Sequence, residues 1–318
     1  VTISFWLCKE RNYHMNTLVK ENVKNELSFE GFLARYTNST KAMVQSHIGD
    51  FFNWMLLNGY ELSRINQSVI NLYLDELRNR GLKNATCNAK ISFLKSFFEF
   101  HNQTFEFKYE PVKAYTHTKV MNYEGFKRVM EYLKINKEVE TGKRTKFLRD
   151  YILFSVLFTT GLRKDEVLSL KHNHVKPLGD KFYISIKTKG NKECVKEIVP
   201  SLVQDINKLM GIEGKESNDY VFTSMAHNRN RQNNKLSNKA INKALNHYYQ
   251  KINKTKEVVT VHSIRNQSGM QYYDAVKGDI LAVQDHLGHA NVATTEKYLR
   301  AVKSQKSDAS SILFNLIS

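Results

Sequence analysis

The sequence predicts an α+β protein of two domains, mainly α-helical with one small β-sheet. The chain has 318 residues, more than a single hydrophobic core usually organises. Apolar residues recur at helical spacing through most of it, and a short alternating stretch near residue 184 indicates paired strands. We therefore expect a helical domain over residues 27–110, a linker over 111–119 and a mixed domain over 120–303.

The net charge of +17 predicts a polyanionic partner, for which nucleic acid is the usual choice. An acidic membrane surface or an acidic protein is the alternative. Cys8, Cys87 and Cys194 are scattered, so neither a disulfide framework nor a zinc site is indicated, and a reducing cytoplasm is expected. The most apolar stretch, 151–160, has the length of a buried helix, so no membrane span is predicted.

The two ends of the chain carry weaker signals. Residues 1–26 form an expected N-terminal extension that lacks a basic leader and a small-residue cleavage site, so they do not resemble a signal peptide. Met15 stands where an alternative translation start can lie. Residues 304–318 form a C-terminal tail whose apolar run, 312–317, is costly unless it is buried.

Three helices with apolar faces are predicted in the first domain, with breaks at Asn58-Gly59 and Gly81. Their expected core residues are Ile48, Phe51, Phe52, Met55, Leu56, Ile70, Tyr73, Leu74, Leu77, Ile91, Leu94, Phe97, Phe98 and Phe100. The polar faces carry basic residues that are candidates for contact with DNA phosphates, although ordinary solvated helix faces look the same. These candidates are Lys41, Arg78, Arg80, Lys83, Lys90 and Lys95.

The second domain begins after the linker marked by Pro111. Helices are expected over 123–133 and over a strongly apolar stretch that ends at Gly161. Arg163 then stands in the turn before a further helix over 164–170. A turn between two packed helices is a suitable place to fix a long side chain.

A β-hairpin follows, because Phe182, Ile184 and Ile186 alternate with polar residues and an apolar group, Val195, Ile198 and Val199, comes after a turn at 190–191. Three lysines decorate its tip: Lys187, Lys189 and Lys192. A loop over 214–235 and a helix over 236–252 complete this part of the chain. Lysine-rich hairpin tips are common, so phosphate contact alone is one interpretation of the three.

The stretch 261–298 concentrates residues that act on phosphate. His262 and Arg265 open a helix that Gly278-Asp279 breaks, and the next helix is stopped by Gly288 just before His289. Tyr298 closes the stretch. Arginine offers a planar fork of donors to phosphate oxygens, histidine moves a proton near neutral pH, and tyrosine can attack phosphorus. Tyr272 and Tyr273 are competing nucleophiles, but they fall in an apolar helix pattern and are expected in the core.

These motifs resemble the tyrosine recombinase (phage integrase) family in order and spacing over roughly residues 115–300. The matching pieces are T-G-L-R-K-D-E-V-L-S-L around Arg163, K-G-N-K-E at 189–193, H-S-I-R at 262–265, and L-G-H with T-T-x-x-Y ending at Tyr298. One departure is Asn266, where the family commonly has histidine. His286 also stands where the family usually has an apolar residue, and we expect it to be structural or a minor DNA contact.

The resemblance implies a site-specific recombinase that works through a 3′-phosphotyrosyl intermediate and a Holliday junction. Tyr298 would be the nucleophile, Arg163, Arg265 and His289 would stabilise the phosphorane, and His262 would assist proton movement. Lys189 would be the general acid, with Lys187 as the alternative. Glu166 would orient Arg163 through a charge-assisted hydrogen bond. No metal and no cofactor is implied.

The resemblance also implies a helical core-binding domain and a catalytic domain that form a C-shaped clamp around DNA. Its partners would be double-stranded recombination sites, bound by a homotetramer on two sites, and accessory DNA-bending proteins. The C-terminal tail would dock in cis or on a neighbouring subunit, and the enzyme would be cytoplasmic and nucleoid-associated. A type IB-like topoisomerase, a catalytically silent regulator and a basic architectural protein remain as alternatives, as does the choice among integration, excision, resolution and inversion.

Overall fold

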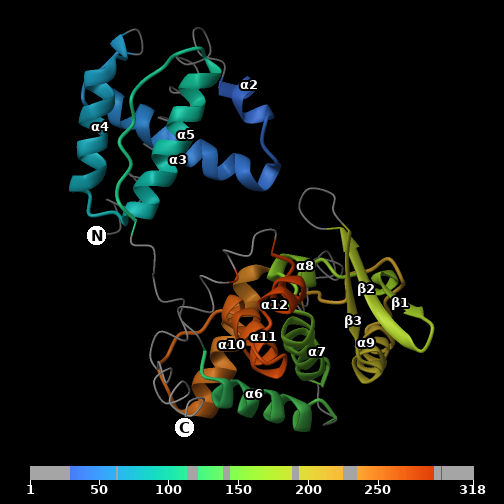
Figure 1. The fold of residues 1–318 in the computed structure, drawn as a ribbon. Coiled ribbons are helices and arrows are strands. Elements are labelled where there is room, and N and C mark those ends of the chain that lie inside the picture. The colour runs from blue at the N-terminus through green and yellow to red at the C-terminus, as the bar shows by residue number, and fades with distance from the viewer. Residues whose placement is uncertain are drawn as a thin grey trace, which may run out of the picture. The chain divides into compact units, whose positions relative to one another are not determined.

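A computed structural model describes residues 29–61, 64–112, 121–138, 144–187, 193–224, 235–289 and 295 (Figure 1). The chain divides into two compact units, residues 1–114 and 115–318, and the division falls inside the stretch predicted as a linker. Within the described residues, none of the helices combines the length and apolar character needed to cross a bilayer.

The first unit is entirely helical in its described part. Its helices are α2 (Phe29–Ala34), α3 (Asn38–Leu57), α4 (Gln67–Asn79) and α5 (Asn84–Phe100). Asn66 caps α4 by accepting a hydrogen bond from the main-chain nitrogen of Val69 at 3.1 Å. The asparagine side chain thereby satisfies a main-chain donor that has no partner inside the helix, which explains where α4 begins.

Aromatic side chains fill the core between α3, α4 and α5. The ring of Phe51 lies edge-on to those of Tyr73 and Phe98, with centroids 5.0 and 5.8 Å apart. The predicted core positions are buried with two exceptions, because Leu56 and Phe100 are 43% and 38% exposed. Both lie in the last turn of their helices, α3 and α5. The helical pattern continues to the end of each helix, so it assigns these two exposed residues to the core.

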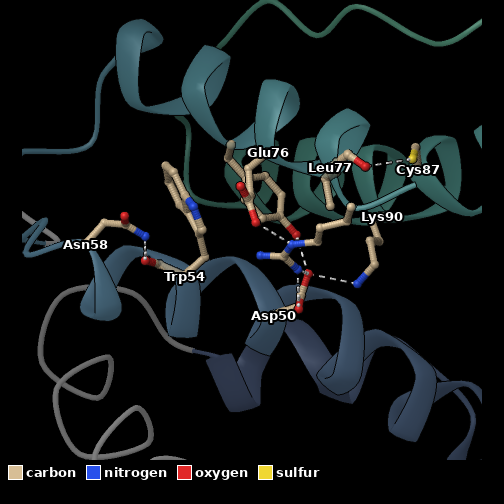
Figure 2. A network of polar contacts seen from close by, with 9 residues as sticks. Asp50, Trp54, Asn58, Glu76, Leu77, Cys87 and Lys90 are labelled. Carbon is tan, nitrogen blue, oxygen red and sulfur yellow. Dashed lines mark hydrogen bonds and ion pairs between the residues drawn. The ribbon is translucent and has the colours of Figure 1, made fainter. Parts of the chain in front are cut away.

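A polar cluster ties the same three helices together around Asp50 (Figure 2). Its carboxylate accepts hydrogen bonds from the Tyr73 hydroxyl at 2.8 Å, the Arg80 guanidinium at 3.0 Å and the Lys90 ammonium at 2.9 Å. Burial by itself would raise the pKa of the Asp50 carboxyl, but the hydrogen bonds from Lys90 and Tyr73 and the nearby positive charges outweigh it and lower this pKa. We call Asp50, Tyr73, Arg80 and Lys90 the Asp50 cluster.

The second unit is mixed, as predicted. Its elements are α6 (Tyr123–Asn136), α7 (Arg144–Thr160), α8 (Lys164–Leu168), a short 3-10 helix η2 (His172–His174), β1 (Val175–Leu178), β2 (Lys181–Lys187), β3 (Glu193–Ile198), α9 (Pro200–Ile212), α10 (Asn238–Asn253), α11 (Val261–Ala275) and α12 (Ile280–Leu287). Helix α7 packs against α6, α9, α11 and β3 and so forms the centre of the unit (Figure 1). Its core side chains Ile152, Phe154 and Val156 have no exposed surface.

The sheet is antiparallel with strand order β1-β2-β3. The hairpin of β2 and β3 was predicted; the edge strand β1 was not, because it is four residues long and contains Pro177, which is tolerated only at a sheet edge. Of the apolar group that indicated the second strand, Ile198 is buried, whereas Val195 and Val199 are 52% and 46% exposed. The register pairs Cys194 with Ile186 and Lys196 with Ile184, so the inward-facing positions of β3 are Cys194, Lys196 and Ile198.

Candidate active site

Gly161 allows the end of α7 and the end of α12 to approach each other closely. Its φ of +61° is one that residues with side chains rarely adopt, and a Cβ atom placed on it would lie 2.9 Å from Nε2 and 3.1 Å from the main-chain oxygen of His286. Thr160 closes α7 by donating to the oxygen of Val156 at 2.6 Å. The chain therefore turns sharply here and brings Arg163 to the start of α8, next to α12.

Arg163 is held by Glu166 and by α12. One oxygen of Glu166 accepts from the main-chain nitrogen of Arg163 at 2.6 Å, and the other accepts from its guanidinium at 3.1 Å. The guanidinium also donates to the main-chain oxygen of Gly288 at 3.1 Å. The Arg163 side chain remains 50% exposed whereas that of Glu166 is 12% exposed. The Glu166 carboxylate thus orients the Arg163 side chain and leaves half of its surface open to a ligand.

Arg265, in the second turn of α11, is 4% exposed. Its guanidinium donates through Nη1 to the oxygen of Gly161 and through Nη2 to the oxygen of Leu287. One planar fork therefore joins the end of α7 to the end of α12, which a lysine with a single nitrogen cannot do in the same geometry.

Helix α12 ends in a left-handed turn that places His289. Gly288 has φ of +59°, and the main-chain nitrogen of His289 donates back to the oxygen of Gln284 at 3.1 Å. The His289 ring is fixed by a hydrogen bond of 2.9 Å between Nδ1 and the hydroxyl of Thr295. This leaves Nε2 as the ring nitrogen available to a ligand.

His262 and His289 share the electrostatic environment of the two arginines. Burial, followed by the charges of Arg265 and Arg163 and by His262, lowers the pKa of His289 to about 4. Burial, Arg265, Lys164 and Arg163 likewise lower the pKa of His262. Both imidazoles are therefore neutral at pH 7. Arg163, Arg265 and His289 meet at the end of α12, and the charges of both arginines reach His262. We call Arg163, His262, Arg265 and His289, which come from three separate parts of the sequence, the basic cluster.

Some predicted site residues lie outside the described residues, namely Tyr298, Lys189 and Lys192. Lys187 is described at the exposed end of β2, where it pairs in register with Glu193. Within the described residues, no group of three or more His, Cys, Asp and Glu side chains is arranged to hold a metal ion.

The basic residues of the helical unit differ from one another. Lys83 and Lys95 are exposed, Lys41 is half-buried, and Lys95 lies 3.8 Å from Glu99. Arg78 is paired with Asp75 and, at 2.6 Å, with Glu110. The Lys90 side chain is only 12% exposed and its ammonium contacts Asp50, so the geometry gives Lys90 a role within the fold rather than on its surface. Phosphate contact by the others stays a prediction.

Two further residues lie at the site: Lys196, which the sequence interpretation did not name, and His286, which it expected to be structural or a minor DNA contact. Lys196 on β3 donates to the main-chain oxygens of Asp285 at 2.6 Å and His286 at 2.9 Å. His286 shares a hydrogen bond of 2.8 Å with the Ser268 hydroxyl, and its ring lies 4.7 Å from that of Tyr272, which favours its structural interpretation. Tyr272 itself is 38% exposed, so its expected place in the core is wrong. The signal for Lys196 was a lysine at an inward-facing strand position.

Comparison with known proteins identifies the family of the chain. The family model described as "Phage integrase family" matches residues 126–305, and that of the "Phage integrase, N-terminal SAM-like domain" matches 28–103. A tyrosine recombinase of Pseudothermotoga lettingae is 26% identical over 291 residues, which cover 89% of this chain and 95% of the relative.

Solved structures show the same fold at lower identity. The XerH site-specific recombinase bound to palindromic difH substrate is 16% identical with a TM-score of 0.63, covering 94% of each chain. A lambda integrase tetramer bound to a Holliday junction is 14% identical with a TM-score of 0.58, covering 89% of this chain and 80% of that one.

The chain belongs to the phage integrase family, and the sequence-based prediction of a site-specific tyrosine recombinase is confirmed. The mainly helical fold with a small sheet is confirmed as well. The topoisomerase and silent-regulator alternatives are not favoured.

Proposed function

We propose that Tyr298 is the nucleophile of this recombinase and that the basic cluster binds the scissile phosphodiester. The observation that carries the proposal is the meeting of Arg163, Arg265 and His289 at the end of α12, where the charges of both arginines reach His262. Arg163 is half-exposed there and pairs with Glu166. Tyr298 lies nine residues after His289 in the sequence, which is the spacing of the family motif.

The proposed reaction is a pair of transesterifications. The Tyr298 oxygen attacks phosphorus, the bond from phosphorus to the 5′ oxygen breaks, and a 3′-phosphotyrosyl ester and a 5′-hydroxyl result. The 5′-hydroxyl of a second duplex then attacks the phosphotyrosine and releases the tyrosine. One ester replaces another in each step, so no energy source is needed, and the covalent route divides one difficult displacement into two easier ones.

Arg163 and Arg265 would donate to the non-bridging oxygens as negative charge develops on the phosphorane. Prepositioned donors of this kind contribute about 3 kcal/mol each to the transition state. His289 is neutral at pH 7, so it would add a hydrogen bond from Nε2, while the neutral His262 would accept the proton of Tyr298. Lys189 would protonate the leaving oxygen, with Lys187 as the alternative.

The proposed partner is a pair of double-stranded recombination sites held by a homotetramer, with accessory DNA-bending proteins as further partners. Support comes from the net charge of +17 and from the likeness in fold to a lambda integrase tetramer bound to a Holliday junction. The helical unit would grip the duplex through Lys41, Lys83 and Lys95. The C-shaped clamp and a cytoplasmic, nucleoid-associated location belong to the same proposal.

A suicide-substrate assay tests the proposal. Nicked duplexes from the DNA flanking the gene are incubated with the full chain, and a covalent protein–DNA adduct is sought on a denaturing gel. We expect an adduct with the natural chain and with Tyr272→Phe, which keeps the ring that lies against His286. Tyr298→Phe should bind the same DNA and form none. An adduct with Tyr298→Phe would assign the nucleophile to another residue.

A further inference from the structure

Lys196 occupies a position where the sheet should carry an apolar side chain. The register pairs it with Ile184, which is fully buried, and the alternation of β3 sets it on the same face as Cys194 and the buried Ile198. A lysine on a core-facing position is costly unless its ammonium is hydrogen-bonded. Burial accordingly lowers the pKa of Lys196 more than any neighbouring charge changes it.

The ammonium finds its partners at the end of α12. It donates to the main-chain oxygens of Asp285 at 2.6 Å and His286 at 2.9 Å. Within the described residues, no carboxylate lies within ion-pair distance of it. A helix C-terminus bears partial negative charge on carbonyls that lack partners inside the helix, so it can hold a cation without neutralising it fully.

Lys196 completes a set of three cations on four consecutive carbonyls. Lys196 takes those of Asp285 and His286, Arg265 takes that of Leu287, and Arg163 takes that of Gly288. His289 follows at once. Any shift of the end of α12 would therefore move the acceptors that orient both arginines and would move the His289 ring as well.

We propose that Lys196 is a positioning residue of the recombination site, which ties β3 to the last turn of α12 and so sets the places of Arg163, Arg265 and His289 for the reaction. This inference rests on the role proposed above for the basic cluster.

The test compares Lys196→Met, which removes charge and donors at similar length, with Lys196→Arg, which keeps both. Lys181→Met is a matched control, because Lys181 is an exposed lysine of the same sheet paired with Glu197 at 3.0 Å. Single-turnover adduct formation on a nicked duplex, DNA affinity by gel shift, and the pKa of His286 by NMR are measured for each.

We expect Lys196→Met to slow adduct formation by about 10- to 100-fold at unchanged DNA affinity, because a misplacement of about 1 Å has effects of this size. Lys196→Arg should recover most of the rate and Lys181→Met should keep all of it. The pKa of His286 is lowered to about 4 by burial, by Lys196 and by Arg265, so Lys196→Met should raise it. If Lys196→Met does not fold, Lys196→Gln, which keeps a neutral donor, should show the slowed rate and the raised pKa.

An unchanged rate in Lys196→Met would overturn the proposal, and so would an unchanged pKa of His286. Weaker DNA binding with a smaller dependence on salt would instead make Lys196 a phosphate contact. If the natural chain forms no adduct, the proposed roles of Tyr298 and the basic cluster fail, whereas the titration of His286 still tests the contact between Lys196 and α12.

Discussion

The Asp50 cluster and the end of α12 both gather arginine and lysine side chains, but the groups that accept their hydrogen bonds differ. In the helical unit, Arg80 and Lys90 converge on one carboxylate, which also accepts from Tyr73. At the end of α12, Lys196, Arg265 and Arg163 converge on main-chain carbonyls, and Glu166 pairs with Arg163.

The difference separates a structural cluster from a binding site. A carboxylate cancels a full charge, whereas the end of a helix offers only about half a negative charge. At the end of α12, main-chain carbonyls accept from the cations in the place that a carboxylate has in the Asp50 cluster. Half of the Arg163 side chain stays exposed there, so a phosphodiester could complete its hydrogen bonding.

The largest effect is expected for Arg265→Lys. A lysine keeps the charge but cannot donate to Gly161 and Leu287 together and still face a phosphate. Adduct formation should fall by about 1,000-fold, equivalent to about 4 kcal/mol. Arg80→Lys, in the Asp50 cluster, is the matched control and should leave the rate at saturating DNA unchanged. Equal losses in both variants would contradict the contrast.

Gly161→Ala tests the close approach of α7 and α12. Alanine at φ of +61° is strained, and its Cβ would meet His286. Gly179 has a φ of +63° with nothing within 4 Å of a Cβ, so Gly179→Ala shares only the backbone cost, about 1–2 kcal/mol. Thermal unfolding should show the larger destabilisation in Gly161→Ala, and only that variant should form adduct more slowly, by about 100-fold. Similar rates of adduct formation in Gly161→Ala and Gly179→Ala would contradict a role for the close approach of α7 and α12.

Asp50→Asn should destabilise the helical unit without changing the chemistry. Lys90 would lose its charged partner and Arg80 would keep only Glu76, at about 2 kcal/mol for a partly buried pair, as measured by urea unfolding at pH 7. The Asp50 pKa is lowered in the folded state, so its contribution is fully present above the unfolded value of about 3.9 and is lost as pH falls through the folded pKa. The adduct rate at saturating DNA should be that of the natural chain, and a slower one would contradict the prediction.

The smallest effect is a missing pH dependence. Because the pKa of His289 is lowered to about 4, this histidine stays neutral from pH 5 to pH 7 in the free enzyme. The pH profile of kcat/KM reports on the free enzyme. It should show no inflection near the usual histidine pKa of about 6.5 that can be assigned to His289. An inflection belongs to His289 if the natural chain shows it and His289→Gln does not. Such an inflection would mean that His289 is solvated and that the basic cluster is more open than described.

Local patterns predicted the helices well and their ends and faces less well. Apolar spacing located the helices that begin at Tyr123 and end before Gly161 and Gly288, because spacing and helix stops act within a few residues. The exposure of Leu56, Phe100 and Val195 depends on which element packs over each residue, and no local pattern contains that information.

The candidate site divides in the same way. The motifs identified Arg163, His262, Arg265 and His289 in order, and the prediction that Glu166 orients Arg163 rests on a spacing of three residues that the hydrogen bonds match. The roles of Tyr298, Lys189 and Lys192 stay predictions. Lys196 was missed because its partners, Asp285 and His286, are about ninety residues away in the sequence.

The sequence by itself determined the family, the helical and mixed units and the chemical types of the site, because helical spacing, charge and ordered motifs are properties of the chain. Only the tertiary structure decided which cations are neutralised. Lys90 and Lys196 both directly follow an apolar residue in the sequence, yet one meets a carboxylate and the other a helix end. Charge compensation depends on distances between distant segments, and those distances are set when the helices and the sheet pack together.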